Sequence, residues 1–417
     1  MSYANAFFSL EEVSNIFDLI TYQRIFIQTQ KFLQSNLDGL KNLQLLVGQF
    51  QYLLNQQYIY FLMIIYKLEI NKQINKQINK QINEQRYQGF DETQISHLAS
   101  ALNQCSQIEN LELDLAQNGI NEEGITNICQ SLSKMTELKS LNLNFTNNSI
   151  DQKKASIISS IWTNYKNLQS LSIDLEDTKI QDQDITELTN SLPQLKNLKK
   201  LSLGISGNYY SDGQVSGLGT CFSSLKNLTN LYLNLGDCNI CKVGIKNLSQ
   251  YFGSCNNLES LLIELSDNNI GDEGIIELVN ELKNSVNLKN LQLYLRGCIQ
   301  SKGVINLGQS LQQFKNLSNL ELDLSYNQIQ DEGITQLFND LSRSQQLSRL
   351  DFSAWDCGIT EEGANNIILA LRNNFSIKDL KLELSGNGFN FEFFTKLSAR
   401  VRKIKQLVKL NFRIECY

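Results

Sequence analysis

One motif recurs every 30 residues along most of this chain. Residues 258–275 and residues 317–334 superimpose position by position. The residues that open each unit are Ile108, Leu138, Leu168, Leu198, Leu228, Leu258, Leu288, Leu317, Leu347, Ile377 and Leu407, with one step of 29 residues and nine of 30. A fixed period of this length is typical of a solenoid, in which every unit buries its apolar face against its neighbours.

Each unit combines two periodicities. The first part alternates apolar and polar residues, as in Leu231 and Leu233, and predicts a short strand with one buried face. The second part has spacings of three and four, as in Ile275, Leu278 and Leu282, and predicts a helix with one apolar face. The position between them is always Asn, Cys or Thr: Asn118, Asn148, Thr178, Asn208, Cys238, Asn268, Cys298, Asn327, Cys357 and Asn387.

The pattern Leu-x-x-Leu-x-Leu, then Asn or Cys, then Ile, Gly and two Leu, resembles leucine-rich repeats of the ribonuclease-inhibitor type. That subtype includes the Ran GTPase-activating protein. The resemblance implies an α/β solenoid shaped as an open curved arc, with a parallel sheet on the concave face and helices on the convex face. One departure is a third alternating apolar residue, such as Leu265, which predicts a strand longer by one in–out pair.

The chain divides into three parts. Residues 89–417 hold a half-repeat, ten units of 29–30 residues and a terminal strand. Residues 67–88 are a linker of repeated Ile-Asn-Lys-Gln, and residues 1–66 are predicted to form a helical segment that caps the array. Residues 56–85 are either a genuine spacer or the product of a wrong gene model, and the sequence leaves both readings open.

Composition weighs against catalysis. The 417 residues include one histidine, His97, which excludes multi-histidine metal sites and makes histidine-based catalysis a poor choice. Phosphate-binding and nucleophile motifs are absent from the sequence. Acidic pairs such as Asp272 and Glu273 precede helices, where negative charge is favoured, so they have a structural explanation. We therefore predict that the protein is not an enzyme and has no catalytic, cofactor-binding or metal-binding residues.

Other features indicate the cellular setting. With 37 Lys and Arg against 43 Asp and Glu, the net charge of −6 argues against nucleic-acid and membrane-surface partners. The longest apolar run has nine residues, Tyr58 to Tyr66, and a membrane-spanning helix needs roughly 20. The N-terminus does not look like a secretory signal, so the nine cysteines are expected to be reduced. We predict a soluble, monomeric protein of the cytoplasm, with the nucleus not excluded.

Solvent-facing strand residues are the best functional clue. Eight of the 22 are acidic and two are basic, and four aromatic residues lie on or beside the strand ends. Aromatic residues are enriched at binding hot spots. We predict that a protein partner with a basic patch binds this concave acidic face through Tyr232, Glu264, Tyr294, Glu321, Asp323, Tyr326, Asp351, Trp355 and Glu383.

The predicted function is that of a non-catalytic protein–protein interaction scaffold. The resemblance also admits a GTPase activator of the Ran-activator type. A substrate-recruiting ubiquitin-ligase subunit is a further alternative, since residues 10–20 resemble an F-box remnant. Finally, the last helix is crowded by Lys396, Arg400, Arg402, Lys403, Lys405 and Lys409, which form either a polar end of the solenoid or a basic contact patch.

Overall fold

A computed structural model describes residues 92–414, apart from residues 106, 210–211 and 375. The proposed N-terminal cap (residues 1–66), the linker (67–88) and the F-box-like stretch (10–20) lie outside the described residues.

Eleven parallel strands form one sheet in chain order from β1 to β11. Each strand begins two residues after the opening residue of its unit, as the repeat frame predicts. Their bounds are β1 (Asn110–Asp114), β2 (Ser140–Asn144), β3 (Ser170–Asp174), β4 (Lys200–Gly204), β5 (Asn230–Asn234), β6 (Ser260–Glu264), β7 (Asn290–Tyr294), β8 (Asn319–Asp323), β9 (Arg349–Ser353), β10 (Asp379–Glu383) and β11 (Lys409–Arg413).

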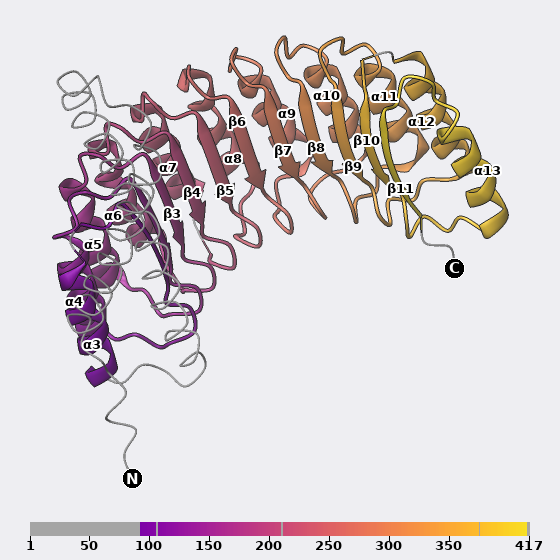
Figure 1. Cartoon of the computed structure of the whole chain (residues 1–417). Helices are drawn as coiled ribbons and strands as arrows, with labels where there is room; N and C mark the ends of the chain where they lie inside the picture. The colour runs from indigo at the N-terminus through magenta and orange to yellow at the C-terminus, as the bar shows by residue number, and fades with distance from the viewer. Residues whose placement is uncertain (1–91, 106, 210–211, 375, 415–417) are drawn as a thin grey trace, which may run out of the picture.

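Helices alternate with the strands. They are α3 (Glu92–Gln104), α4 (Glu122–Leu132), α5 (Gln152–Ser160), α6 (Asp182–Asn190), α7 (Asp212–Ser224), α8 (Lys242–Ser249), α9 (Gly271–Leu282), α10 (Ser301–Leu311), α11 (Gln330–Leu341), α12 (Glu361–Asn373) and α13 (Phe391–Val401). Short 3-10 helices, η1 (Ile161–Asn164), η2 (Leu192–Gln194) and η3 (Phe252–Ser254), follow α5, α6 and α8. Figure 1 shows an open arc with the sheet along its inner side and the helices outside. The predicted leucine-rich-repeat solenoid is therefore confirmed for the described residues.

The expected longer strand is not present as such. Strand β6 ends at Glu264, before the third apolar residue, Leu265. Hydrogen bonding nevertheless continues, because the amide of Leu265 donates to the carbonyl of Tyr294 at 2.9 Å. Two residues later Asp267 has a φ of 59°, which turns the backbone out of the extended region and ends the strand geometry.

A buried asparagine joins neighbouring units. The side-chain amide of Asn268 donates to the carbonyls of Leu235, at 2.7 Å, and Leu265, at 2.9 Å. Its carbonyl oxygen accepts from the amides of Cys238, at 3.1 Å, and Ile240, at 2.8 Å. One side chain therefore satisfies backbone groups of two units that water cannot reach, which explains the recurrence of Asn at this position.

Two of the three cysteines at this position, Cys298 and Cys357, change the loop of the preceding unit. The Cys298 thiol donates to the carbonyl of Leu265 at 3.0 Å, but it does not replace the amide oxygen as an acceptor. Instead the amide of Gly271 donates to the Cys298 carbonyl at 3.1 Å, and Gly271 has a φ of 65°. Gln330 repeats this arrangement with Cys357 at 3.1 Å. Helices α9 and α11 consequently start one residue earlier than the helices next to them.

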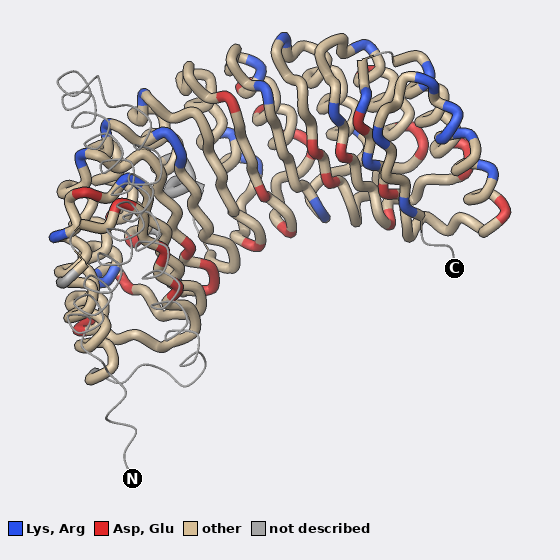
Figure 2. Tube along the Cα trace, in the orientation of Figure 1, with Lys and Arg blue, Asp and Glu red and all other residues tan. Residues whose placement is uncertain are grey.

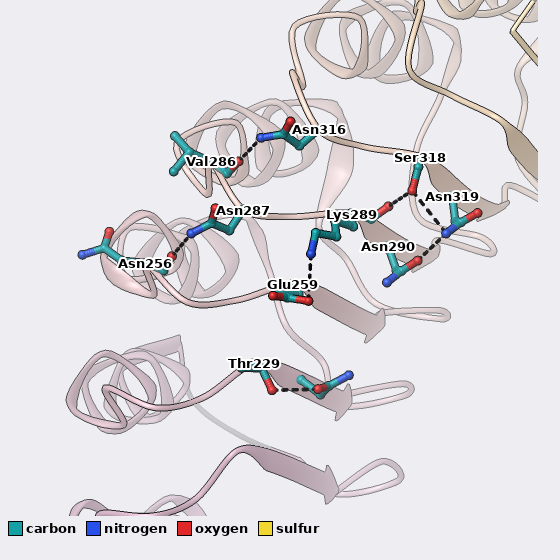
Figure 3. A network of polar contacts seen from close by, with 11 residues as sticks. Thr229, Asn256, Glu259, Val286, Asn287, Lys289, Asn290, Asn316, Ser318 and Asn319 are labelled. Atoms are coloured by element: carbon teal, nitrogen blue, oxygen red, sulfur yellow. Dashed lines mark hydrogen bonds and ion pairs between the residues drawn. The ribbon is translucent and has the colours of Figure 1, made fainter.

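A second asparagine ladder, which the sequence analysis did not identify, ties together the loops that lead into the strands. The side chain of Asn287 donates to the carbonyl of Asn256, and that of Asn316 donates to the carbonyl of Val286, both at 2.7 Å. Figure 3 shows these contacts beside the ion pair between Lys289 and Glu259. In this part of the array, both ends of a strand are thus fixed to the neighbouring unit by side chains as well as by the sheet.

Candidate binding face

Two rows of side chains line the concave face. The third and fifth residues of each strand face this side, alternating with the buried leucines of the core. The register is constant, so each row runs straight across the sheet. The first row includes Tyr232, Leu262, Gln292, Glu321 and Asp351. The second row includes Glu264, Tyr294, Asp323, Ser353 and Glu383. All of the predicted strand residues therefore lie on one continuous surface.

Glu321 lies at the centre of a polar cluster. The Tyr294 hydroxyl donates to one of its oxygens at 2.6 Å, and the Gln292 amide donates to the other at 2.6 Å. Burial raises the pKa of Tyr294, and the hydrogen bond to Glu321 raises it further. The hydroxyl therefore stays protonated and holds the carboxylate in place.

The other predicted carboxylates are also held in place. Asp323 accepts from the amide of Ser325 at 2.9 Å, and Glu383 accepts from the amide of Ser385 at 3.0 Å. Asp351 forms an ion pair with Lys381 at 3.0 Å, so part of its charge is already compensated within the protein. These contacts fix the carboxylates and reduce the negative field that the sequence alone suggests.

An aromatic stack borders the acidic rows. The ring centroids of Tyr326 and Trp355 lie 4.4 Å apart, with an angle of 55° between the planes. The guanidinium carbon of Arg296 lies 3.9 Å from the centroid of the Tyr326 ring. Tyr326 is 41% exposed, so the stack presents apolar surface to a ligand. The sequence analysis missed Arg296, although it occupies the same position of its unit as Trp355.

A second acidic cluster lies nearer the N-terminal end. The Asn234 side chain donates to Glu176, two strands away. Gly204 lies between them, and a Cβ there would lie only 3.0 Å from an oxygen of Asp174. The missing side chain therefore leaves room for Glu176 to reach across the sheet. Burial raises the pKa of Glu176, and the nearby charge of Asp174 raises it further.

Tyr232 connects this cluster to the predicted face. It is 39% exposed, and burial raises its pKa, with further contributions from Glu176 and Glu264. Burial also raises the pKa of Glu264, although hydrogen bonds from Ser266 oppose the shift. The sequence analysis placed Glu264 on the binding face but did not identify Glu176. Its position, two residues beyond the strand, was the only available signal.

This face presents carboxylates, amides, serine hydroxyls and aromatic rings. The hydroxyl of Ser325 donates to Asp323 at 2.5 Å, so it too is held in place. Across residues 92–414, with the gaps given above, no group of three or more His, Cys, Asp or Glu side chains is placed to hold a metal ion. Within the same described part, no helix is long and apolar enough to cross a membrane. The Cys238 thiol is buried and donates to the carbonyl of Ile205 at 3.3 Å, as expected for a structural cysteine.

Comparisons with known proteins agree with this architecture. A family model described as a leucine-rich repeat matches residues 254–279 and 316–338. A search of curated proteins finds no match. The matched segments cover strands β6 and β8 and the helices that follow them. Leucine-rich repeats generally mediate protein–protein interactions, and the fold is typically a non-catalytic scaffold. Together with the eleven-stranded open solenoid, these matches support a leucine-rich repeat fold.

Proposed function

We propose that the protein is a non-catalytic scaffold whose concave face binds a partner protein bearing a basic patch. The observation that carries this proposal is the exposed stack of Tyr326 on Trp355 beside the carboxylate of Asp323 and the cluster around Glu321. Rigid aromatic anchors next to polar groups that are already oriented bind with little loss of side-chain entropy.

The carboxylates add an electrostatic component. Adjacent strands are about 4.8 Å apart, so the charges of Asp323, Glu321 and Glu383 act together on an approaching protein. Arg296 and Lys381 reduce this field locally. We therefore place the main contact around the aromatic stack, with the acidic rows speeding the encounter and fixing the orientation of the partner.

The repeat subtype, the cellular compartment and the oligomeric state are part of the same proposal. The period of 29–30 residues and the helix in every complete unit support the ribonuclease-inhibitor-like subtype. The described cysteines are thiols rather than disulfides, which supports a reducing compartment such as the cytoplasm. We propose that the chain acts there as a monomer, since a curved solenoid offers a binding surface without a second subunit.

Two matched charge-reversal variants test the proposal. The first changes Asp323 and Asp351 to Lys, and the second changes Glu277 and Glu281 on helix α9 to Lys. Each pair contains one ion-paired carboxylate, since Asp351 pairs with Lys381 and Glu277 with Lys246. The net charge therefore changes equally, while only the first pair lies on the concave face.

Immobilised wild type and both variants are compared for proteins that they capture, and captured candidates are then titrated at low and moderate salt. We expect the helix variant to retain the partner and the concave variant to lose it, with a salt-dependent association rate for the wild type. Loss of binding by the helix variant alone would place the interaction on the outer helices and overturn the proposal.

A further inference from the structure

A cavity of about 520 Å³ opens on the convex side between α12 and α13. Phe393, which is 7% exposed, contributes apolar atoms to its wall in front of the fully buried Leu397, and Lys396, Arg400 and Lys403 contribute three cations. Glu361, on α12, is the single carboxylate that lines it. Figure 2 shows the basic residues gathered along this last helix of the arc, far from the middle of the concave face.

The cavity lies where α13 lacks a glycine that the two preceding helices on this end of the array, α11 and α12, both carry. Helices α9, α11 and α12 carry glycine at a position that touches the preceding unit: Gly274, Gly333 and Gly363. In the preceding unit, a Cβ at Gly274 would lie 2.8 Å from a carbon of Ile245, and one at Gly333 would lie 2.8 Å from the hydroxyl oxygen of Ser301. Phe393 occupies this position in α13. Its ring packs on Phe389 with centroids 5.3 Å apart, where α9, α11 and α12 leave room only for hydrogen. Helix α13 contacts α12 less extensively than the other consecutive helices contact one another.

The cations at the two ends of the cavity differ in their partners. Lys396 pairs with Glu392 at 2.5 Å on the same helix. Arg400 donates across the groove to the side-chain oxygen of Asn365, a neutral acceptor on α12. Among the described residues, neither Arg400 nor Lys403 forms an ion pair. This end of the cavity thus carries positive charge that the described protein does not neutralise.

A purely structural role explains these residues less well. Cations near a helix C-terminus are stabilised by the helix dipole, and they can donate to the last carbonyls. The contact that Arg400 makes is instead with Asn365 of the neighbouring helix. Its guanidinium is therefore held at the mouth of the cavity, with donors left over for a ligand.

We propose that this cavity is a second docking site, which binds an acidic segment of a partner protein. A ligand carboxylate is bound by Arg400 and Lys403, and an adjacent apolar side chain packs against Phe393. The volume lies within the range of about 300–1,000 Å³ that ordinary ligand pockets span. Because the concave face is acidic and this site is basic, the two surfaces select partners of opposite charge, and the solenoid can hold both at once.

The probe is a fluorescein-labelled peptide of repeated Glu-Glu-Leu, and its binding to the full chain is followed by fluorescence anisotropy. A peptide with Gln in place of Glu is the ligand control. The double variant Arg400→Gln with Lys403→Gln removes the cavity cations. Its matched control is Arg402→Gln with Lys405→Gln, which removes two exposed cations near the cavity but not in its lining.

We expect the cavity variant to bind the acidic peptide roughly tenfold or more weakly, because charged hydrogen bonds are lost. The matched control should change the affinity by less than about threefold, the effect of exposed charges. Equal weakening by both variants would show diffuse attraction to a basic surface and overturn the proposal. Equal binding of the Gln peptide, or no binding of the acidic peptide by wild type at low salt, would also overturn it.

Two further measurements separate the alternatives. The variant with Asp323 and Asp351 changed to Lys should bind the acidic peptide as wild type does, so this proposal can fail independently of the concave one. Phe393→Gly introduces the residue that α9, α11 and α12 carry at this position and should abolish peptide binding while thermal melting reports that the array still folds. Sedimentation that shows wild-type self-association, abolished in the Arg400 and Lys403 variant, would identify a second copy as the occupant and overturn the choice of an acidic partner.

Discussion

Replacing Asn268 by Leu tests how the units are held together. The two side chains are similar in size, but leucine offers neither a donor nor an acceptor. Asn268 is 6% exposed, and it bonds backbone groups of its own unit and of the unit before it. The substitution therefore removes polar contacts from the core while it leaves the volume nearly unchanged.

The structure sets the magnitude. The amides of Cys238 and Ile240 lose their acceptor, and both residues are fully buried. Each buried donor without a partner costs about 1–3 kcal/mol, which gives about 2–6 kcal/mol for the pair. The leucine side chain recovers part of this by burying apolar surface, so we expect a net loss of about 2–4 kcal/mol in the free energy of unfolding.

Urea denaturation followed by circular dichroism measures the effect. Asn284→Leu is the control, since Asn284 is exposed and the change should shift the free energy of unfolding by less than about 0.5 kcal/mol. Asn268→Cys should cost less stability than Asn268→Leu. Cys298 is the equivalent residue of the next unit, and its thiol already donates to the carbonyl of Leu265 in the unit before it. Equal denaturation midpoints for Asn268→Leu and Asn284→Leu would refute the reasoning.

Two other substitutions follow from the geometry of particular sites. Glu176→Gln should raise the melting temperature at pH 7. The folded protein raises the pKa of Glu176 above its ordinary 4.5, so the wild type loses stability as the pH rises from 4.5 through the pKa of the folded state, whereas Gln stays neutral and keeps the oxygen that accepts from Asn234. A benefit that persists at pH 3 would contradict this. Gly274→Ala should lower the free energy of unfolding by about 1–3 kcal/mol through overpacking. The matched Gly217→Ala, whose added Cβ meets nothing within 4 Å, should raise the free energy of unfolding by about 0.5–1 kcal/mol. Urea denaturation measures both effects, and equal effects would show that close packing does not require Gly274.

The repeat itself was readable because its signals are local. The alternation of Leu231 and Leu233 with polar residues predicts which strand positions face the core, since successive side chains point to opposite faces. Spacings of three and four among Ile275, Leu278 and Leu282 do the same for a helix. The period then fixes the register between strands, and so the row in which each concave residue lies.

Contacts between units could not be read in this way. Glu176 meets Asn234 only because Gly204, in the strand between them, has no side chain. Arg296 stacks on Tyr326 from a different unit. The sequence repeat does not predict the direction in which a long side chain such as that of Arg296 points. The sequence identified the candidate face, but it overestimated the free charge there because it could not show the pairing of Asp351 with Lys381.

The sequence by itself determined the number of units, the buried positions and the presence of one shorter unit, because each depends on the period and on the cost of burying polar groups. The tertiary structure decided the details that depend on two units together. Cys298 in one unit advances the helix of the unit before it, and Phe393 lines a cavity between α12 and α13. In both cases the physical reason is that the effect of a side chain depends on the adjacent unit, whose backbone must accommodate a lost hydrogen-bond acceptor or an added aromatic ring.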